Sequence, residues 1–571
     1  MKMIVTLSLL VLCASAVPGY AQQQQPRTSR EDALDPSPID PKVDPNIDMF
    51  VNDWNSAAPR NMYGGVVFRD ILTKLEGPDP LHPTKKGAVL VNITAISRAE
   101  LAPGARASGR ASAGERQVFF TMAGAGTIAV NSKSHVVRKG TGFTLTPDTA
   151  FTLTNTGKVP VIFYVRTEPL PANYVGSPDL VVVNSLENDR RVGAHWAHIN
   201  SGGPAGMTLI GIAPRTMPQP HSHPGEEVWL MVEGETVLSL GKQIRRMPAG
   251  QAYKIPPTGM TAHSNLNLGD EPVEMIFMGP ASGGGGGRGG PGGAAAPAPQ
   301  GGPAAQGRDF ARLENGAYNR MTEQDIDMFM GDWRNAFPRI MHGNFYFRDM
   351  LTALQGADEL RPARRGAVLT NAEAVSFVQL EAGSTAHRVE GELKNIQQTF
   401  VVNSGTGVIT SGSTKVDLVK GMAFIITPGL DFRLTATGDQ YMTFYAVSEK
   451  LPAGFAPRTT LEVVDNRNRA QTTNAWVNQE RPLISKSDGL SQYGAVTQVT
   501  MKSMTMSRPS SSAPGVEEIW IATDGDVELL LGKELRKLRA GTAYRVPSTG
   551  ITAHANINAS SQEARFLYVV K

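Results

Sequence analysis

The feature that most constrains this 571-residue chain is an internal duplication. The segment DMFVNDWNSAAPRNMYGGVVFRDILTKLEG, which begins at Asp48, returns as DMFMGDWRNAFPRIMHGNFYFRDMLTALQG from Asp327. Between the two copies, residues 282–308 consist mainly of glycine, proline and alanine. Such a composition cannot build a core and indicates a flexible linker. The chain is therefore expected to consist of two homologous halves on a tether.

Short strand-like runs separated by glycine turns fill both halves. In the first half, QVFFTMAGAGTIAV, KGTGFTLTP, AFTLTN and VPVIFYV form one block, and MTLIGIAP, EEVWLMVEGETVLSL and AYKIP begin a second. Several strands at this spacing predict small β-barrels or sandwiches. We expect an all-β chain of tandem small barrels, two per half. A short helix should lead each half, with Met49, Phe50 and Trp54 on one face in the first.

The start of the chain has the pattern of a signal peptide. Lys2 precedes an apolar stretch from Ile4 to Val17, and Ala21 is a suitable cleavage point. We therefore expect an exported protein, periplasmic or extracellular. The single cysteine, Cys13, falls within this peptide, so the mature chain would contain no disulfide.

These features divide the chain into seven expected segments. They are a signal peptide (1–21), a disordered tail (22–45), a leading helix with barrel 1 (46–170), barrel 2 (171–281), the linker (282–308), a leading helix with barrel 3 (309–450) and barrel 4 (451–571).

The charge balance excludes one class of partner. Lysine and arginine number 55 against 52 acidic residues, which does not resemble the basic footprint of a nucleic-acid binder. No apolar run after the signal peptide is long enough to span a bilayer. We expect a small-molecule substrate or ligand, with no nucleic acid and no membrane span. A homodimer through barrel faces is compatible with this organisation.

The stretch HSHPGEEVW, residues 221–229, carries the chemistry. Side chains at i, i+2 and i+6 of an extended strand face the same way, so His221, His223 and Glu227 share a face. His263 follows a glycine turn, and an antiparallel neighbour could place it opposite them. Three imidazoles and one carboxylate suit a divalent metal, with iron or manganese favoured and zinc or nickel as alternatives. Two histidines, a glutamate and a third histidine in this pattern favour a metal site over a polar surface loop.

The same residues resemble the two-part signature of the cupin superfamily. The first part is H-x-H-x3-E-x6-G over His221–Gly234, and the second is G-x5-P with a later H-x3-N over Gly250–Asn267. The resemblance is specific in this block and extends more loosely over the other three. It implies cupin-type jelly-roll barrels, a metal in the mouth of this one, and His221, His223, Glu227 and His263 as its ligands. Arg215 stands where the family usually has a glycine.

The second half keeps only part of this set. Glu518 and His554 match Glu227 and His263, whereas Ser511 and Ala513 stand roughly where His221 and His223 stood. One glutamate and one histidine bind a metal poorly, so we expect barrel 4 to lack one.

The first block of each half departs further from the pattern. Gln117 and Gln398 occupy the glutamate position, and Phe151 or Phe432 replaces the later histidine. His387 is out of register and is interpreted as a surface residue. We expect barrels 1 and 3 to be structural.

Three further residues are candidates for contact with the substrate or with the metal ligands. His195 and His198 become Ala475 and Asn478 in the half that lost its ligands. At i and i+3 of a strand they face opposite ways, so one of the two is expected to approach the pocket. Drift of surface histidines explains the difference equally well. Gln219 shares parity with His221 and is the third candidate.

Other residues recur whether or not a metal motif follows, which favours a structural role for them over sugar or acid binding. They are Trp54/Trp333, Arg60/Arg339, Arg69/Arg348 and Asp70/Asp349.

The sequence supports one leading function and two alternatives. The leading hypothesis is a metal-dependent enzyme acting on a small organic molecule, with oxygenase-type chemistry. No separate acid-base pair or nucleophile stands out, so the catalytic residues are unknown, and fold alone does not choose the reaction. The first alternative is a non-catalytic small-molecule or sugar-binding protein. The second, a metal that only staples one barrel, is disfavoured because a stapling site should be closed.

Overall fold

The structure is a computed structural model of the chain. It describes residues 46–170, 174, 180–184, 189–192, 198–202, 207–218, 225–256, 261, 263–279, 325–474, 478–532, 534–550 and 552–571, with the backbone alone at 189–192, 198–202 and 553. Within these ranges, no helix combines the length and the apolar character needed to cross a membrane.

The described residues of the first half form two pairs of sheets, which we name sandwich 1 and sandwich 2. The large sheet of sandwich 1 has the order β13 (Val182–Asn184), β10 (Thr141–Leu145), β7 (Glu115–Ala123), β12 (Val161–Pro169), β5 (Ala95–Leu101), β3 (Val66–Lys74), β2 (Pro59–Met62), with β4 (Ala88–Leu90) beside β3. Its small sheet is β6 (Arg106–Gly109), β11 (Phe151–Asn155), β8 (Ala125–Val130), β9 (Lys133–Arg138). The large sheet of sandwich 2 is β1 (Val51–Asp53), β20 (Gln251–Ile255), β17 (Glu227–Glu233), β22 (Val273–Met278), β16 (Met207–Ile212), β15 (His198–Gly202), β14 (Asp189–Val192). Its small sheet is β19 (Gln243–Pro248), β18 (Glu235–Leu240), β21 (His263–Leu266).

The second half repeats this arrangement as sandwich 3 and sandwich 4. The large sheet of sandwich 3 is β24 (Pro338–Met341), β25 (Phe345–Ala353), β27 (Ala372–Leu380), β34 (Met442–Lys450), β29 (Ile396–Ser404), β32 (Ala423–Ile426), β35 (Glu462–Val464), with β26 (Ala367–Leu369) beside β25. Its small sheet is β28 (Thr385–His387), β33 (Arg433–Ala436), β30 (Gly407–Ser411), β31 (Thr414–Leu418). The large sheet of sandwich 4 is β23 (Met330–Asp332), β44 (Thr542–Val546), β41 (Glu518–Asp524), β46 (Ala564–Val570), β38 (Ala495–Met501), β37 (Gln479–Ser485), β36 (Thr472–Thr473). Its small sheet is β39 (Thr505–Met506), β45 (Ala553–Asn558), β42 (Val527–Leu531), β43 (Glu534–Leu538), with β40 (Ser510–Ser511) beside β45.

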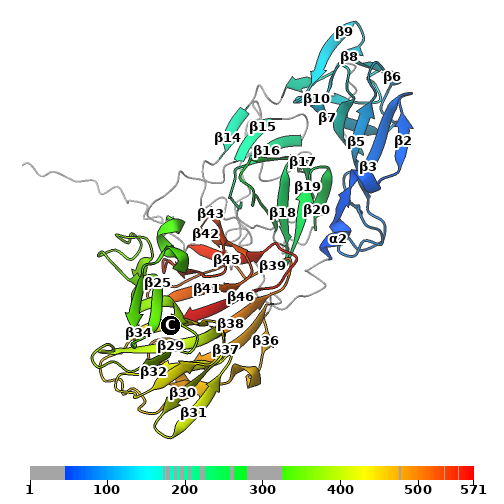
Figure 1. Ribbon diagram of the computed structural model, residues 1–571. Coiled ribbons are helices and arrows are strands. Elements are labelled where there is room, and N and C mark those ends of the chain that lie inside the picture. Colours follow the sequence, from blue (N-terminus) through cyan, green and yellow to red (C-terminus); the bar gives the residue numbers. More distant parts are fainter. Residues whose placement is uncertain are drawn as a thin grey trace, which may run out of the picture.

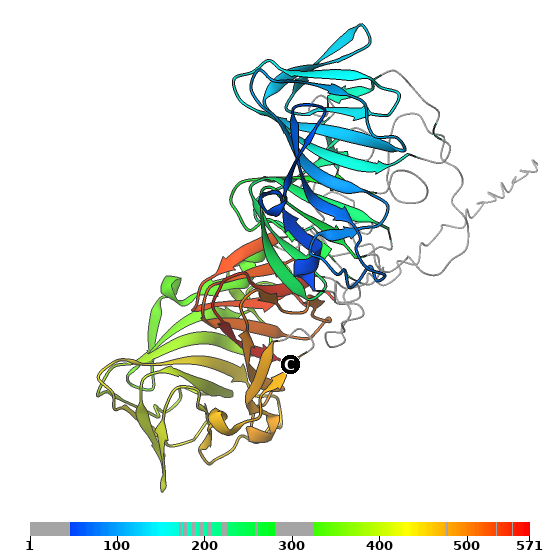
Figure 2. The same cartoon turned by 90° about the vertical axis from the view of Figure 1, so that its right-hand side faces the viewer.

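The expected fold class is confirmed: the chain is all-β, with tandem jelly-roll barrels, two per half, and a short helical turn leading each half. Neighbouring strands are antiparallel except for the pairs β3–β4 and β25–β26. Figures 1 and 2 show the sandwiches stacked in the order 1, 2, 4, 3, so that sandwiches 2 and 4 meet at the centre of the molecule.

The large sheets are buried on both faces. In β7, Phe119 packs inside sandwich 1, whereas its neighbour Phe120 packs in a second cluster that also contains Val228 and Leu230 of sandwich 2. Because successive side chains of a strand point to opposite faces, such a strand reads as a continuous apolar run. This explains why QVFF shows no polar alternation. Each fully buried phenylalanine contributes about 1.5–3 kcal/mol relative to exposure.

The leading helices are shorter than the sequence pattern suggested. In the first half, α2 spans Ile47–Phe50 and buries Ile47 and Phe50. In the second half the equivalent turn, η3 (Ile326–Phe329), is a 3₁₀ helix. The expectation that Trp54 shares a helical face with Met49 and Phe50 is wrong, because β1 intervenes and Trp54 begins a separate 3₁₀ turn, η1 (Trp54–Ser56). The other short 3₁₀ turns are η4 (Trp333–Asn335), η5 (Asn466–Asn468) and η6 (Lys486–Asp488).

The leading segment crosses over to the second sandwich of its own half. Strand β1 pairs with β20 of sandwich 2, and β23 pairs with β44 of sandwich 4. Trp54 and Trp333 lie against Gly250 and Gly541, where any Cβ would collide with the indole ring. Both glycines also have left-handed φ angles, 93° and 92°, so glycine is required there on two grounds.

The repeated charged residues pair at the edge of the large sheets of sandwiches 1 and 3. Arg60 bonds Asp70 at 2.8 Å, and Arg339 bonds Asp349 at 2.7 Å. The guanidinium groups of Arg69 and Arg348 lie 5.8 Å from the ring centres of Trp54 and Trp333. These contacts confirm the structural role expected for the four repeated pairs.

Candidate metal centre

Glu227 and His263 face each other inside sandwich 2. Glu227 begins β17 in the large sheet, and His263 begins β21 in the small sheet. The Nε2 atom of His263 lies 3.1 Å from Oε1 of Glu227, and the two residues are 1% and 7% exposed. The structure therefore brings two of the four predicted ligands together across the sandwich, as strand parity and an antiparallel partner required.

The surroundings of this pair are polar and closely packed. The indole N–H of Trp229, two residues along β17, donates to Oε1 of Glu227. Tyr253 of the large sheet donates its hydroxyl to Oδ1 of Asn265 in the small sheet at 3.0 Å. Burial, reinforced by the charge of Glu227, raises the pKa of Tyr253 well above its ordinary value, so this hydroxyl stays protonated. The Tyr253–Asn265 bond therefore ties the two sheets together beside the site.

The remaining predicted residues lie partly outside the described ranges. His221, His223, Gln219 and His195 lie outside the described residues, and His198 opens β15 with its backbone alone described. Within the part of the chain that the structure describes, no three His, Cys, Asp or Glu side chains are grouped to hold a metal ion. The ligand roles of all four residues therefore stay predictions.

Glu226, directly before Glu227, faces the opposite way and anchors the strand. Its carboxylate accepts from the backbone N–H groups of Val91 and Asn92, both at 2.7 Å. The buried Lys254 ammonium lies 3.7 Å from the same carboxylate. The motif EE therefore places one carboxylate toward the candidate centre and the other in a bond to sandwich 1. The sequence analysis did not single out Glu226, although the second glutamate in the motif EE was a signal that it could have used.

Sandwich 4 contains the same pair of a glutamate and a histidine, again with a tryptophan beside the glutamate. Nε2 of His554 lies 2.9 Å from Oε1 of Glu518, and the Trp520 indole donates to that oxygen at 2.8 Å. The hydroxyl of Ser512 donates to the other carboxylate oxygen. All the acceptor oxygens of Glu518 are thus engaged by groups of the protein itself.

Two backbone markers show which residues of the first half match which residues of the second. Arg215 and Met504 both have left-handed φ angles, 55° and 54°, and the bridge Thr216–Asn267 recurs as Thr505–Asn558. Aligning these markers leaves two extra residues in the second half, at positions between Ser507 and Glu517.

Counting forward from these markers pairs His221 and His223 with Ser510 and Ser512, whereas counting back from Pro-Gly pairs them with Ser511 and Ala513. Because His221 and His223 lie outside the described residues, the expectation for Ser511 and Ala513 stays a prediction. Ser510 is the strand partner of His554, while the Ser511 hydroxyl turns to the carbonyl of Gly550.

The ion pair of sandwich 4 should make the second half acid-sensitive. Burial raises the pKa of Glu518, but the His554 charge and the three hydrogen bonds outweigh it and hold the pKa at about 2, below the ordinary 4.5. Stability from a lowered carboxyl pKa is present above the unfolded value and is lost as pH falls toward the folded one. Between about pH 6 and pH 2, the wild type should lose up to about 3 kcal/mol more unfolding free energy than Glu518→Gln. Urea titrations across this range measure it, and parallel pH profiles would contradict the ion pair.

Sandwiches 1 and 3 replace the glutamate by glutamine. In sandwich 1, Gln117 accepts from the Tyr63 hydroxyl. In sandwich 3, Gln398 Oε1 lies 2.8 Å from Nε2 of His342. Burial lowers the pKa of His342, which favours the neutral imidazole.

Sequence reasoning missed His342, because it comes from the turn before β25 rather than from either motif. It matches Tyr63 in the repeat, and Phe432 lies beside it with ring centres 5.3 Å apart. His387, by contrast, is exposed, as expected.

Asn478, the counterpart of His198, lies inside sandwich 4. Gln479 pairs with Thr500 as Ile199 pairs with Gly211, which fixes this correspondence. The Asn478 side chain is fully buried and donates to the carbonyl of Met506 at 3.3 Å. The equivalent position thus points inward in the half where its side chain is described.

Comparison with known proteins locates the family resemblance in sandwich 2. Residues 208–279, which include β17 and β21, match the cupin domain family. This segment, with Glu227 and His263, is therefore similar to a cupin domain. No curated protein matches the chain.

Solved structures that match the chain include AerE from Microcystis aeruginosa, at 11% identity. That match covers 40% of this chain and 98% of AerE, with a TM-score of 0.32. A variant of oxalate decarboxylase from Bacillus subtilis matches at 12% identity over 41% of this chain and 78% of that chain, with a TM-score of 0.32. Another structure of that decarboxylase, at 13% identity with the same coverage and a TM-score of 0.31, concerns its Mn(II) centers.

Proposed function

We propose that sandwich 2 is a cupin metal centre and that the chain is an exported enzyme using one divalent metal on a small organic molecule, with oxygenase-type chemistry. The observation that carries the proposal is the buried pair of Glu227 and His263, which meet at 3.1 Å from opposite sheets. A carboxylate and an imidazole in this arrangement are half of a three-histidine, one-glutamate ligand set.

The second half supports the assignment of the other two ligands. Ser510 is the strand partner of His554, and Ser512 donates to Glu518. Histidines at the equivalent positions, His221 and His223, would extend farther toward Glu227 and His263 than serines can. A divalent iron or manganese ion held there, or zinc or nickel in its place, would supply Lewis-acid or redox chemistry toward a substrate oxygen.

The chain's own residues supply orientation and shelter. Trp229 holds one oxygen of Glu227 by its indole N–H, and the Tyr253–Asn265 bond fixes the distance between the two sheets. Near-complete burial of Glu227 and His263 excludes bulk water from that side. His198, by its equivalence to the inward-facing Asn478, is favoured over His195 as the group that contacts the substrate or carries a proton.

Turnover separates this proposal from a binding protein. Metal-loaded protein would be offered small hydroxylated and carboxylated compounds while oxygen consumption and product formation are followed, with the His221→Ala/His223→Ala variant as control. Metal-dependent turnover absent from the variant supports the enzyme. Thermal stabilisation by a compound with no turnover would instead favour the non-catalytic alternative.

Placing histidines at positions 510 and 512 of sandwich 4 should create a second metal centre. In Ser510→His/Ser512→His, the new imidazoles join Glu518 and His554, so metal bound per chain should rise from about one to about two equivalents. Ser511→His is the matched control, because the Ser511 hydroxyl bonds to the carbonyl of Gly550 instead. Metal content by mass spectrometry measures the change. A double variant that still binds one equivalent would contradict the view that histidines at positions 510 and 512 complete a ligand set with Glu518 and His554.

A further inference from the structure

The segment Arg215–Pro218 leads directly into residues 219–224, which carry His221 and His223. Its backbone is bonded to the other half of the chain. Thr216 forms a bridge with Glu534, and the Leu535 N–H donates to the carbonyl of Arg215 at 3.0 Å. Strand β43 of the second half therefore holds the segment that directly precedes residues 219–224 of the first.

Side chains reinforce this contact. Met217 is fully buried in a cluster that joins the halves and includes Leu530, Leu535 and Ile557 of sandwich 4. The Arg215 guanidinium bonds Asp270 of its own half at 3.0 Å and Glu528 of the other at 3.3 Å. Desolvated apolar contacts contribute most to such a junction, and the partly exposed ion pairs set its register.

The backbone of the segment is fixed at both ends. Arg215 has φ 55°, a left-handed conformation that costs a residue other than glycine about 1–3 kcal/mol and persists only where its surroundings impose it. The Arg215 N–H donates to the carbonyl of Gly269 at 3.2 Å, and the Arg215 carbonyl accepts a hydrogen bond from the Leu535 N–H. At the far end, the hydroxyl of Ser264, next to His263, donates to the Pro218 carbonyl.

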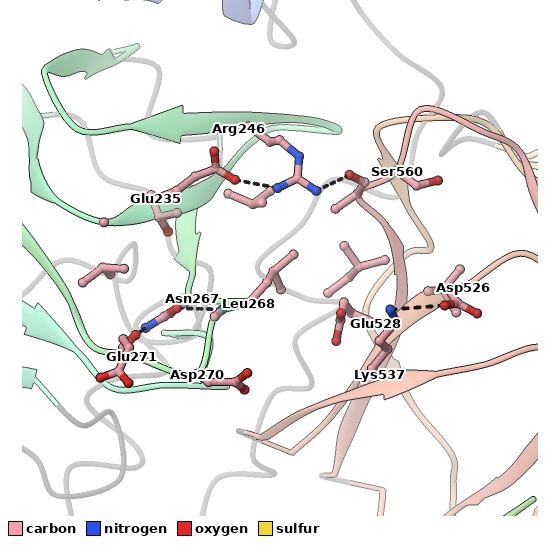
Figure 3. A pocket seen from close by; sticks show the side chains of 18 of the residues that line it. Glu235, Arg246, Asn267, Leu268, Asp270, Glu271, Asp526, Glu528, Lys537 and Ser560 are labelled. Carbon is pink, nitrogen blue, oxygen red and sulfur yellow. Dashed lines mark hydrogen bonds and ion pairs between the residues drawn. The ribbon is translucent and has the colours of Figure 1, made fainter.

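The junction between the halves is only partly filled. A cavity of about 550 Å³ lies between β18, β19 and β42, and Figure 3 shows Glu235 and Arg246 on one wall with Glu528 and Lys537 on the other. Arg246 crosses to the carbonyl of Ala559 at 2.9 Å. Val237 and Ile557 belong both to the wall of this cavity and to the cluster around Met217 and Leu535.

We propose that the second half is an intramolecular partner of the metal centre: its strand β43 clamps Arg215–Pro218 and thereby restricts where His221 and His223, which follow in the sequence, can be placed. This inference rests on the proposed function, since it concerns the same four ligands. It gives a role to a half that has itself lost two of them. Holding ligands in place before binding lowers the entropy cost of binding, which raises affinity without a new ligand.

The full-length variant Leu535→Asp tests the clamp by placing a carboxylate in the apolar cluster. Manganese(II) titration should show a dissociation constant weakened by about tenfold or more, the size seen when groups supporting metal ligands are removed. Hydrogen exchange should show loss of protection at residues 215–218, with or without metal. Small-angle scattering would show whether the halves separate. Arg245→Ala is the matched control, because Arg245 bonds Asp48 within the first half.

The outcomes separate the clamp from the metal centre itself. Separated halves with unchanged manganese affinity and unchanged exchange at residues 215–218 would overturn the clamp. A wild type that binds no metal would overturn the proposed function, while the exchange measurement would still test whether β43 holds the segment.

If Leu535→Asp fails to fold, Arg215→Met with Glu528→Gln removes the bridging charges instead. Methionine tolerates the left-handed backbone, as Met504 shows at φ 54°. That variant should weaken manganese binding in the same direction, and equal affinity would count against the clamp.

Discussion

Replacing His221 and His223 together by alanine should abolish metal binding and leave the fold intact. Glu227 and His263 alone offer two donors, and their counterparts Glu518 and His554 pair with each other at 2.9 Å, with Ser510 and Ser512 beside them. The wild type at 100 times the dissociation constant of manganese should gain about 2.7 kcal/mol of unfolding free energy, and the variant none. Calorimetric titration and thermal unfolding with and without metal measure both effects.

A matched control uses a histidine outside the site. His387→Ala removes an exposed imidazole of sandwich 3 and should leave the titration unchanged. Manganese affinity in the double variant equal to that of the wild type would show that the metal, if bound, is held elsewhere.

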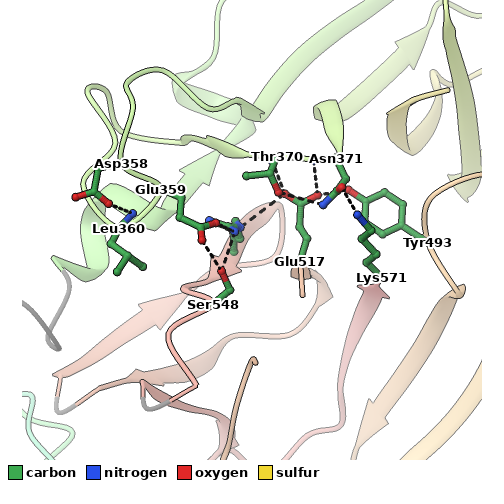
Figure 4. Close-up of polar contacts among 10 residues, drawn as sticks. Asp358, Glu359, Leu360, Thr370, Asn371, Tyr493, Glu517, Ser548 and Lys571 are labelled. Atoms are coloured by element: carbon green, nitrogen blue, oxygen red, sulfur yellow. Dashed lines mark hydrogen bonds and ion pairs between the residues drawn. The ribbon is translucent and has the colours of Figure 1, made fainter. Parts of the chain in front are cut away.

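The second large effect is expected from Glu517, the buried acid directly before Glu518. Its carboxylate accepts from the backbone N–H groups of Thr370 and Asn371 at 2.6 and 3.0 Å and from the Tyr493 hydroxyl. Figure 4 shows Thr370 and Asn371 of sandwich 3 and Tyr493 of sandwich 4 around Glu517. Glu517 therefore joins sandwiches 3 and 4 through several polar contacts.

Glu517→Ala should destabilise the second half by about 3–5 kcal/mol, the cost of breaking a buried charged pair from one side. Arg545, which is 1% exposed, lies 3.6 Å from Glu517 and would keep only Glu359, at 2.7 Å, as an acidic partner. Two backbone N–H groups would also lose their acceptor, and each unmet buried donor is costly. Denaturant unfolding of the second half measures the loss.

An exposed ion pair provides the comparison. Glu462→Ala removes the partner of Arg458, a pair that is about one-third exposed or more, and should cost at most about 1 kcal/mol. Equal losses in Glu462→Ala and Glu517→Ala would contradict the view that the buried acid anchors the start of β41. Because Glu226 plays the same part before Glu227, the result bears directly on how the metal centre is positioned.

The parts of the site that strand parity determines could be predicted from the sequence. Glu227 and Trp229 lie two residues apart on one strand and share a face, while Glu226 and Val228 face the neighbouring sandwich. The expectation that an antiparallel strand brings His263 opposite Glu227 follows from the same periodicity, and the structure places the two atoms 3.1 Å apart.

The rest depended on contacts that no local pattern encodes. The crossover of β1 to sandwich 2 joins residues about 200 positions apart, as Val51 pairs with Tyr253. His342, which has a φ angle of 52°, contacts Gln398 from a turn, and the surrounding sequence does not predict this conformation. The insertion that separates the two halves after Pro218 and Ser507 became visible only from the left-handed backbone of Arg215 and Met504.

The central claim is one metal ion in sandwich 2, and metal content tests it most directly. Mature protein purified from its native compartment would be examined by mass spectrometry beside the His221→Ala/His223→Ala variant. We predict about one iron or manganese ion per chain in the wild type and almost none in the variant. A wild type without metal, or a variant that retains the full equivalent, would contradict the metal centre proposed for His221, His223, Glu227 and His263.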